Sequence, residues 1–144
     1  MTVIQKVALA VIGGASAVVG LWAQALPRSF YDDFPGLGRV WVAVDGPFNE
    51  HLVRDVGGLN LGLAFVALAA LVTANVAIGR VAGAAALIYG LPHLLYHATH
   101  LDPFDTGDAV ALMVSLGGAA LAAVVALSSS GRSTATGRSA QPAR

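Results

Sequence analysis

The segment VGGLNLGLAFVALAALVTANVAI, residues 56–78, contains no charged side chain. At about 1.5 Å per residue, it is long enough to cross the ~30 Å hydrocarbon core of a bilayer as a helix. Gly58 and Gly62 lie on one face of that helix, a spacing of small residues that lets a second helix approach closely. The segment therefore predicts a transmembrane helix packed tightly against a neighbour.

Further apolar runs lie on both sides of this segment. The predicted helices cover approximately residues 7–26, 53–78, 81–100 and 108–127, with a short turn at Gly79–Arg80. Short connections make consecutive helices antiparallel. The sequence therefore predicts an all-α fold, an integral membrane antiparallel four-helix bundle formed by residues 1–127. The alternative for the first run is a signal peptide, because Ala23-Gln24-Ala25 resembles a cleavage site.

The composition supports a membrane protein and excludes several kinds of site. Hydrophobic residues make up 56% of the chain and charged residues 11%, far below the ~25% of soluble domains. The chain has no cysteine, which excludes disulfides, thiolate metal sites and iron–sulfur clusters. It has no basic stripe of the kind that binds nucleic acid. The expected partner is the lipid bilayer, and a homo-oligomer or a larger membrane complex is compatible with the sequence.

Polar segments follow the first and the last predicted helix. Residues 27–50 combine turn residues with aromatic residues such as Tyr31 and Trp41, a mixture typical of the membrane–water interface. We expect an ordered outer loop there, between the first two helices. Residues 128–144 are rich in Ser, Thr, Gly, Ala and Arg and offer little to bury, so they predict a disordered basic tail.

The distribution of basic residues predicts the topology. Lys6, Arg80, Arg132, Arg138 and Arg144 fall on the face that carries both termini, and Arg28, Arg39 and Arg54 fall on the other face with all the acidic residues. The positive-inside rule then places the termini in the cytoplasm. We expect a multi-pass protein of the plasma membrane, N-in and C-in, with a cytoplasmic tail.

The histidines cluster at the predicted outer level of the membrane. His93, His97 and His100 are spaced i, i+4, i+7, so they lie within an arc of about 60° on one helical face. His51 and Asp55 share a face at the start of the second predicted helix, next to Glu50. Continuing that face leads to Gly58 and Gly62, which predicts that His51 and Asp55 point into the bundle.

Imidazole and carboxylate donors without sulfur suit transition metals such as copper, zinc or iron. The sequence therefore predicts a metal site formed by six residues, which are Glu50, His51, Asp55, His93, His97 and His100. Two alternatives stay open: a hydrogen-bonded polar cluster without metal, and haem, which needs histidines on facing helices. Asp108 is expected to be a helix N-cap. No motif identifies a reaction, so whether the protein is an enzyme is left open.

The segment DVGGLNLG (residues 55–62) and the histidine-rich end of the third helix resemble the small DoxX-like membrane proteins. The resemblance covers residues 7–127 and implies an integral four-helix protein, tied in some members to quinone-linked oxidation; it carries no catalytic residue over. A fainter likeness links the candidate site to the membrane copper site of particulate methane and ammonia monooxygenases. There an Asp-x3-His order holds, which His51 and Asp55 reverse.

The sequence therefore leaves three alternative functions. The first is a metal-dependent membrane oxidoreductase or metal-handling protein, the second a haem or quinone electron carrier, and the third a structural or accessory subunit whose polar cluster only fixes packing.

Overall fold

The computed structural model describes residues 1–128, and this part of the chain is almost entirely helical. The elements in chain order are α1 (Val3–Ala25), α2 (Pro27–Asp33), β1 (Pro35–Gly36), β2 (Arg39–Val40), α3 (Glu50–Thr73), α4 (Val76–Thr99) and α5 (Thr106–Ser128). Within the described residues, α1, α3, α4 and α5 are each long and apolar enough to span a membrane. The predicted all-α fold with four membrane-spanning helices is confirmed, and the chain is an integral membrane protein. The predicted disordered tail lies, after Ser128, outside the described residues.

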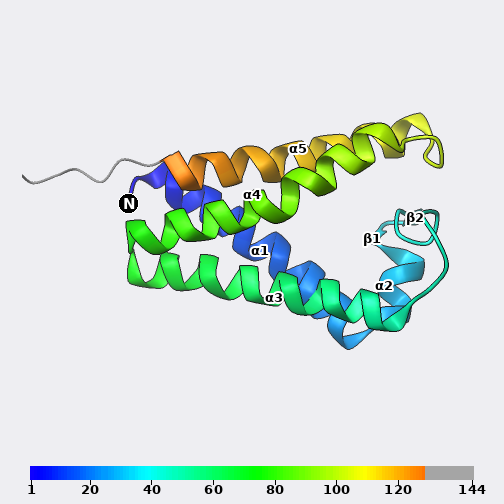
Figure 1. The fold of residues 1–144 in the computed structure, drawn as a ribbon, viewed down its shortest axis with the longest axis horizontal. Coiled ribbons are helices and arrows are strands. Elements are labelled where there is room, and N and C mark those ends of the chain that lie inside the picture. The colour runs from blue at the N-terminus through cyan, green and yellow to red at the C-terminus, as the bar shows by residue number, and fades with distance from the viewer. Residues whose placement is uncertain (129–144) are drawn as a thin grey trace, which may run out of the picture.

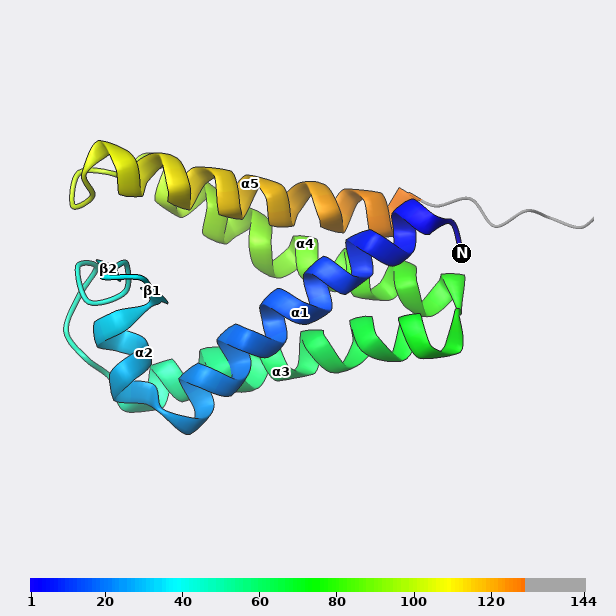
Figure 2. The ribbon, with the colours of Figure 1, turned by 180° about the vertical axis from the view of Figure 1, so that it is seen from behind.

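The spanning helices form two pairs that converge at one end of the molecule. Figures 1 and 2 show α3 alongside α1 and α4 alongside α5, with the pairs diverging away from the N-terminus. We call the end with the N-terminus and the α3–α4 turn the terminal end. The opposite end, with α2, the β1–β2 hairpin and the α4–α5 turn, is the loop end. α1 crosses between the pairs, lying near α5 at its start and near α3 at its end.

The turn between α3 and α4 is built by Ala74 and Asn75. Ala74 adopts a left-handed backbone conformation that ends α3. The Asn75 side chain accepts hydrogen bonds from the N–H groups of Ala77 and Ile78, at 2.9 and 3.2 Å, and so caps α4. The turn therefore precedes the position predicted at Gly79–Arg80, and both of those residues belong to α4.

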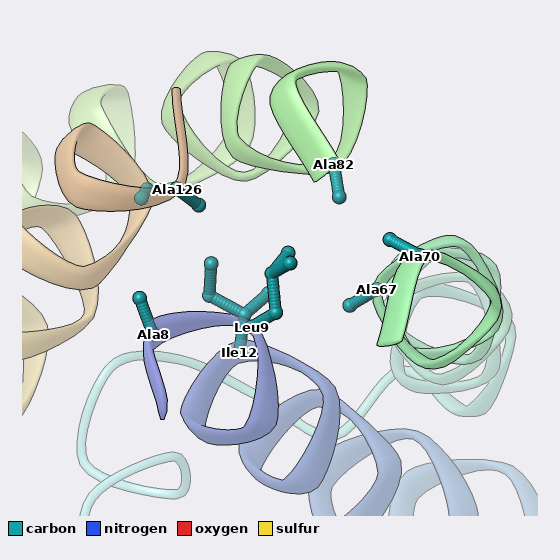
Figure 3. Packing of buried hydrophobic residues seen from close by; sticks show 8 residues of the cluster. Ala8, Leu9, Ile12, Ala67, Ala70, Ala82 and Ala126 are labelled. Atoms are coloured by element: carbon teal, nitrogen blue, oxygen red, sulfur yellow. The ribbon is translucent and has the colours of Figure 1, made fainter. Parts of the chain in front are cut away.

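The main buried cluster lies at the terminal end, where the two pairs meet. Its members come from all four spanning helices: Ala8, Leu9, Ile12, Ala67, Ala70, Ala82, Ala123 and Ala126. Figure 3 shows the labelled side chains directed toward the space between the helices. Alanines dominate because short side chains let the helix backbones approach closely. A Cβ on Gly83 would lie 2.7 Å from the backbone nitrogen of Leu127, so α4 and α5 are also in close contact.

The rotation of α3 differs from the prediction. A Cβ on Gly57 would lie 2.8 Å from the backbone nitrogen of Gln24, whereas one on Gly58 or Gly62 would meet nothing within 4 Å. The prediction that Gly58 and Gly62 form the close-packing face of this helix is therefore wrong. The close contact is made by Gly57, and the neighbour is α1. A shift of one residue rotates a helix by about 100°, so the side chains expected inside the bundle face elsewhere.

The loop between α1 and α3 is ordered, as predicted, and holds α2 and the hairpin. Pro27 begins α2, where its missing N–H costs no hydrogen bond. Phe30 of α2 is buried with Ala23 of α1 and Val53 of α3. The side chains of Phe34, Val42 and Phe48 pack against this second cluster, which fixes the loop to the α1–α3 pair.

Candidate functional site on the histidine face of α4

The helical periodicity of α4 places the candidate site residues on one face of the helix. Gly79 of this helix packs against Leu9 and Gln5 of α1 at the terminal end. His97 lies five full turns further along, on the same face, with His93 one turn before it. At the loop end this face therefore points toward the side where the α1–α3 pair diverges. We call the side chains of Tyr89, His93 and His97 the histidine face.

The two imidazoles of this face are in contact. The ring centroids of His93 and His97 lie 4.8 Å apart with the rings nearly perpendicular. Tyr89 stacks on His93 at 5.8 Å, and Phe104 from the α4–α5 turn contacts His97 edge-on at 6.0 Å. The pair is thus enclosed between aromatic rings, which restricts the imidazole rotamers.

His97 is buried, with 7% of its surface exposed, and its Nδ1 atom has no hydrogen-bond partner among the described residues. A buried polar atom without a partner costs about 1–3 kcal/mol. Such atoms in folded proteins call for an explanation, and a bound ligand is one. His97 therefore has a ring nitrogen at the centre of the face that is free to bind a ligand.

The polar side chains next to the histidine face already have hydrogen-bond or stacking partners. Tyr96 donates its hydroxyl hydrogen to Oδ1 of Asp45 at 3.1 Å. His100, at the end of α4, stacks on Tyr96 with 4.2 Å between ring centroids, and its Nδ1 lies 2.8 Å from the Tyr96 carbonyl oxygen. His100 is the C-cap of α4, and the imidazoles in contact on this face are those of His93 and His97.

Asp45 is a neighbour that the sequence did not reveal. It lies between β2 and α3 and accepts a hydrogen bond from Tyr96, the residue before His97. Nothing in the local sequence distinguishes it from the other acidic loop residues. Asp45 lies next to Tyr96 only because the segment between β2 and α3 reaches across to α4 in the folded protein.

The remaining predicted ligands lie on the other helix pair. His51 pairs with Asp55 at 3.3 Å, and their side chains are 87% and 62% exposed. Glu50 accepts a hydrogen bond from Arg54 at 2.9 Å. The prediction that His51 and Asp55 point into the bundle is wrong, because Gly57 rather than Gly58 faces the neighbouring helix. Figure 1 shows the start of α3 beside α2, across the loop end from the end of α4.

As a result, the six predicted residues do not form one cluster. Within residues 1–128, no group of three or more His, Asp or Glu side chains is arranged to hold a metal ion. An ion bound by His93 and His97 would need further donors, from water, from Asp45 after a rearrangement, or from a second molecule.

Asp108 also differs from its predicted role. The N-cap of α5 is formed by Asp105, whose Oδ1 accepts the N–H of Asp108 at 2.8 Å. The Asp108 carboxylate instead accepts hydrogen bonds from the Arg39 guanidinium and from Nε1 of Trp41, the latter at 3.0 Å. These bonds connect β2 and the residue that follows it to the start of α5.

Comparison with known proteins adds no family to this description. No family model, no curated protein and no solved structure matches the chain. The resemblance to DoxX-like proteins therefore stays a prediction.

Proposed function

We propose that this integral membrane protein binds a transition-metal ion on the histidine face of α4, with His93 and His97 as ligands. The observation that carries the proposal is the contact between two imidazoles on adjacent helical turns, one of which keeps a buried Nδ1 without a partner. Histidines spaced i, i+4 on a helix can chelate one ion.

The ligating atoms available at the site limit which metal ions it would bind. Neutral imidazole nitrogen suits copper, zinc and iron, and the chain has no cysteine to favour softer binding. Asp45 would supply an oxygen ligand if it exchanged its Tyr96 hydrogen bond for the ion. With two or three protein ligands, positions stay open for water or another ligand, as in catalytic rather than structural sites. This pattern fits metal handling or redox chemistry.

The proposal includes an orientation. With the terminal end in the cytoplasm of a plasma-membrane protein, the histidine face lies near the outer surface, where ions reach it from outside the cell. Lys6 and Arg80 at the terminal end, together with the three arginines that follow α5 in the sequence, outnumber the three arginines at the loop end and support this orientation.

A structural role is the competing function, and one observation favours it. Tyr96 and Asp45 already join α4 to the loop without any ligand. If the polar cluster only fixes this packing, the protein binds no metal, and changes to the cluster alter stability alone.

Metal titration of the purified full chain in lipid nanodiscs separates the two functions. Copper or zinc sulfate is added, and the bound metal per chain is measured after removal of free ions. We expect saturation at one ion per chain, abolished in His97→Gln and weakened at least tenfold in His93→Gln. The matched control His51→Gln removes an exposed histidine from the other helix pair and should bind as the wild type does.

Three other results of these measurements would contradict the proposal or change it. Absence of stoichiometric binding would refute the metal proposal and leave the structural role. A loss of binding in His51→Gln would show that the site includes α3. A Soret absorption band in the purified protein would replace the metal ion with haem.

A further inference from the structure

We infer that residues 34–48 form a strap that is hinged on the α1–α3 pair, latched to the α4–α5 pair, and able to open toward the histidine face when the latch is released. The inference concerns access to the histidine face and rests on the proposed function only for the identity of the ligand. In both views of the ribbon, the hairpin within the strap lies at the loop end between the diverging helix pairs (Figures 1 and 2).

The hinge side of the strap is apolar. Phe34, Val42 and Phe48 pack against the buried cluster of Ala23, Phe30 and Val53. The Phe34 ring also lies 4.7 Å from the Phe30 ring and 6.0 Å from the Trp22 ring, centroid to centroid. Separating these groups would expose several aromatic side chains at once, so this side of the strap stays attached.

The latch side is polar and rests on few side chains. Asp108 of α5 accepts hydrogen bonds from Arg39 and Trp41, and Asp45 accepts one from Tyr96 of α4. The Arg39 side chain is 41% exposed, and Tyr96 is also exposed. Water can replace the partners of Arg39 and Tyr96, so these two bonds contribute less than buried ones. The strap should therefore detach first from the α4–α5 pair.

The strap reaches the edge of the candidate site at Asp45, which accepts a hydrogen bond from Tyr96, the residue before His97. Trp41 is buried where it reaches Asp108. Release of the contacts at Asp108 and Tyr96 would move this carboxylate away and open the face from the aqueous side.

Chemical modification of histidine measures this opening without any metal. Diethyl pyrocarbonate acylates imidazole nitrogens, and mass spectrometry reads the rate at each histidine in the full chain in nanodiscs. His51 is exposed and serves as the internal reference. We expect His97 to react much more slowly than His51 in the wild type. Asp108→Asn should raise the His97 rate, relative to that of His51, by about tenfold, as expected for loss of a charge-assisted hydrogen bond.

Three further variants test the latch: two single substitutions and one double variant that can be crosslinked. Asp102→Asn removes the same charge from an exposed position in the α4–α5 turn and should leave the His97 rate unchanged. Tyr96→Phe removes the hydrogen bond to Asp45 and should raise the rate several-fold. Because the chain has no cysteine, Arg39→Cys combined with Asp108→Cys can be crosslinked by a bifunctional maleimide. The crosslink should slow His97 modification compared with the same variant before crosslinking.

The crosslinking comparison uses one folded protein in two states, so it does not depend on the stability of a single substitution. A faster reaction in Asp108→Asn and a slower one after crosslinking support the strap. An unchanged His97 rate in Asp108→Asn, or no effect of the crosslink, overturns it. Metal binding with an unchanged His97 rate would uphold the proposed function and reject the strap alone.

Discussion

Gly57 and Gly58 are neighbours in the sequence but have different surroundings in the fold. A Cβ on Gly57 would collide with the α1 backbone at Gln24, whereas a Cβ on Gly58 would meet open space. The sequence marks Gly58 and Gly62 as a pair of small residues, and this pattern predicted the wrong face of α3. A single residue thus determines whether His51 and Asp55 point into the bundle or away from it.

This difference predicts opposite effects of two matched substitutions. Gly57→Ala should lower the free energy of unfolding by about 1–3 kcal/mol, because the added methyl group overpacks the contact with α1. Gly58→Ala adds the same methyl group to an open face and should leave stability unchanged or raise it slightly, since Ala favours helix over Gly. Thermal unfolding of both variants in detergent checks this. Equal stability of the two would mean that α3 is rotated differently.

The candidate site was partly predictable at this scale. The spacing of His93 and His97 places them on one face from sequence alone, and the structure brings their rings into contact. Asp45 was not predictable, because it reaches Tyr96 through a loop and a sequence separation of 51 residues. Helical periodicity identifies neighbours within an element, but it cannot identify neighbours that the path of a loop creates.

At the scale of elements, caps determine where the helices begin. Asn75 caps α4 and Asp105 caps α5, whereas the sequence predicted Asp108 as the α5 cap. Both aspartates stand near the start of the same apolar run, so composition cannot choose between them. The apolar runs themselves predicted the four spanning helices, because length and hydropathy suffice for that. The hairpin escaped prediction because each of its strands has two residues.

The cap assignment makes a prediction about α5. Asp105→Ala should lower the free energy of unfolding by about 1 kcal/mol, because the N–H of Asp108 loses its acceptor at the helix start. Asp102→Ala, in the same turn, is the control and should change stability little. Unfolding midpoints of the two variants in the same detergent provide the measurement. A larger effect at Asp102 would contradict the assignment of the cap.

At the scale of the whole molecule, the two helix pairs meet at the terminal end and are bridged by the strap at the loop end. The sequence predicted a single antiparallel bundle with one shared outer site. The arrangement in pairs depends on which helix faces carry the small residues, and several faces of this alanine- and glycine-rich chain qualify. For that reason, the predicted six-residue site is divided between the two pairs.

The topology can be tested with single cysteines in the cysteine-free chain. Leu37 is fully exposed at the hairpin tip, and Thr73 lies exposed at the end of α3. With the termini in the cytoplasm, a membrane-impermeant maleimide applied to intact cells should label Leu37→Cys but not Thr73→Cys. Lysed cells should label both. The reverse pattern in intact cells would invert the proposed orientation.

The central claim is that one metal ion binds between His93 and His97, apart from His51. Pulsed EPR of the copper(II)-loaded protein counts the imidazoles that coordinate the ion. We expect two coordinated imidazoles in the wild type and in His51→Gln, and one in His93→Gln. A spectrum without coordinated imidazole in the wild type, or the loss of one imidazole in His51→Gln, would contradict the claim.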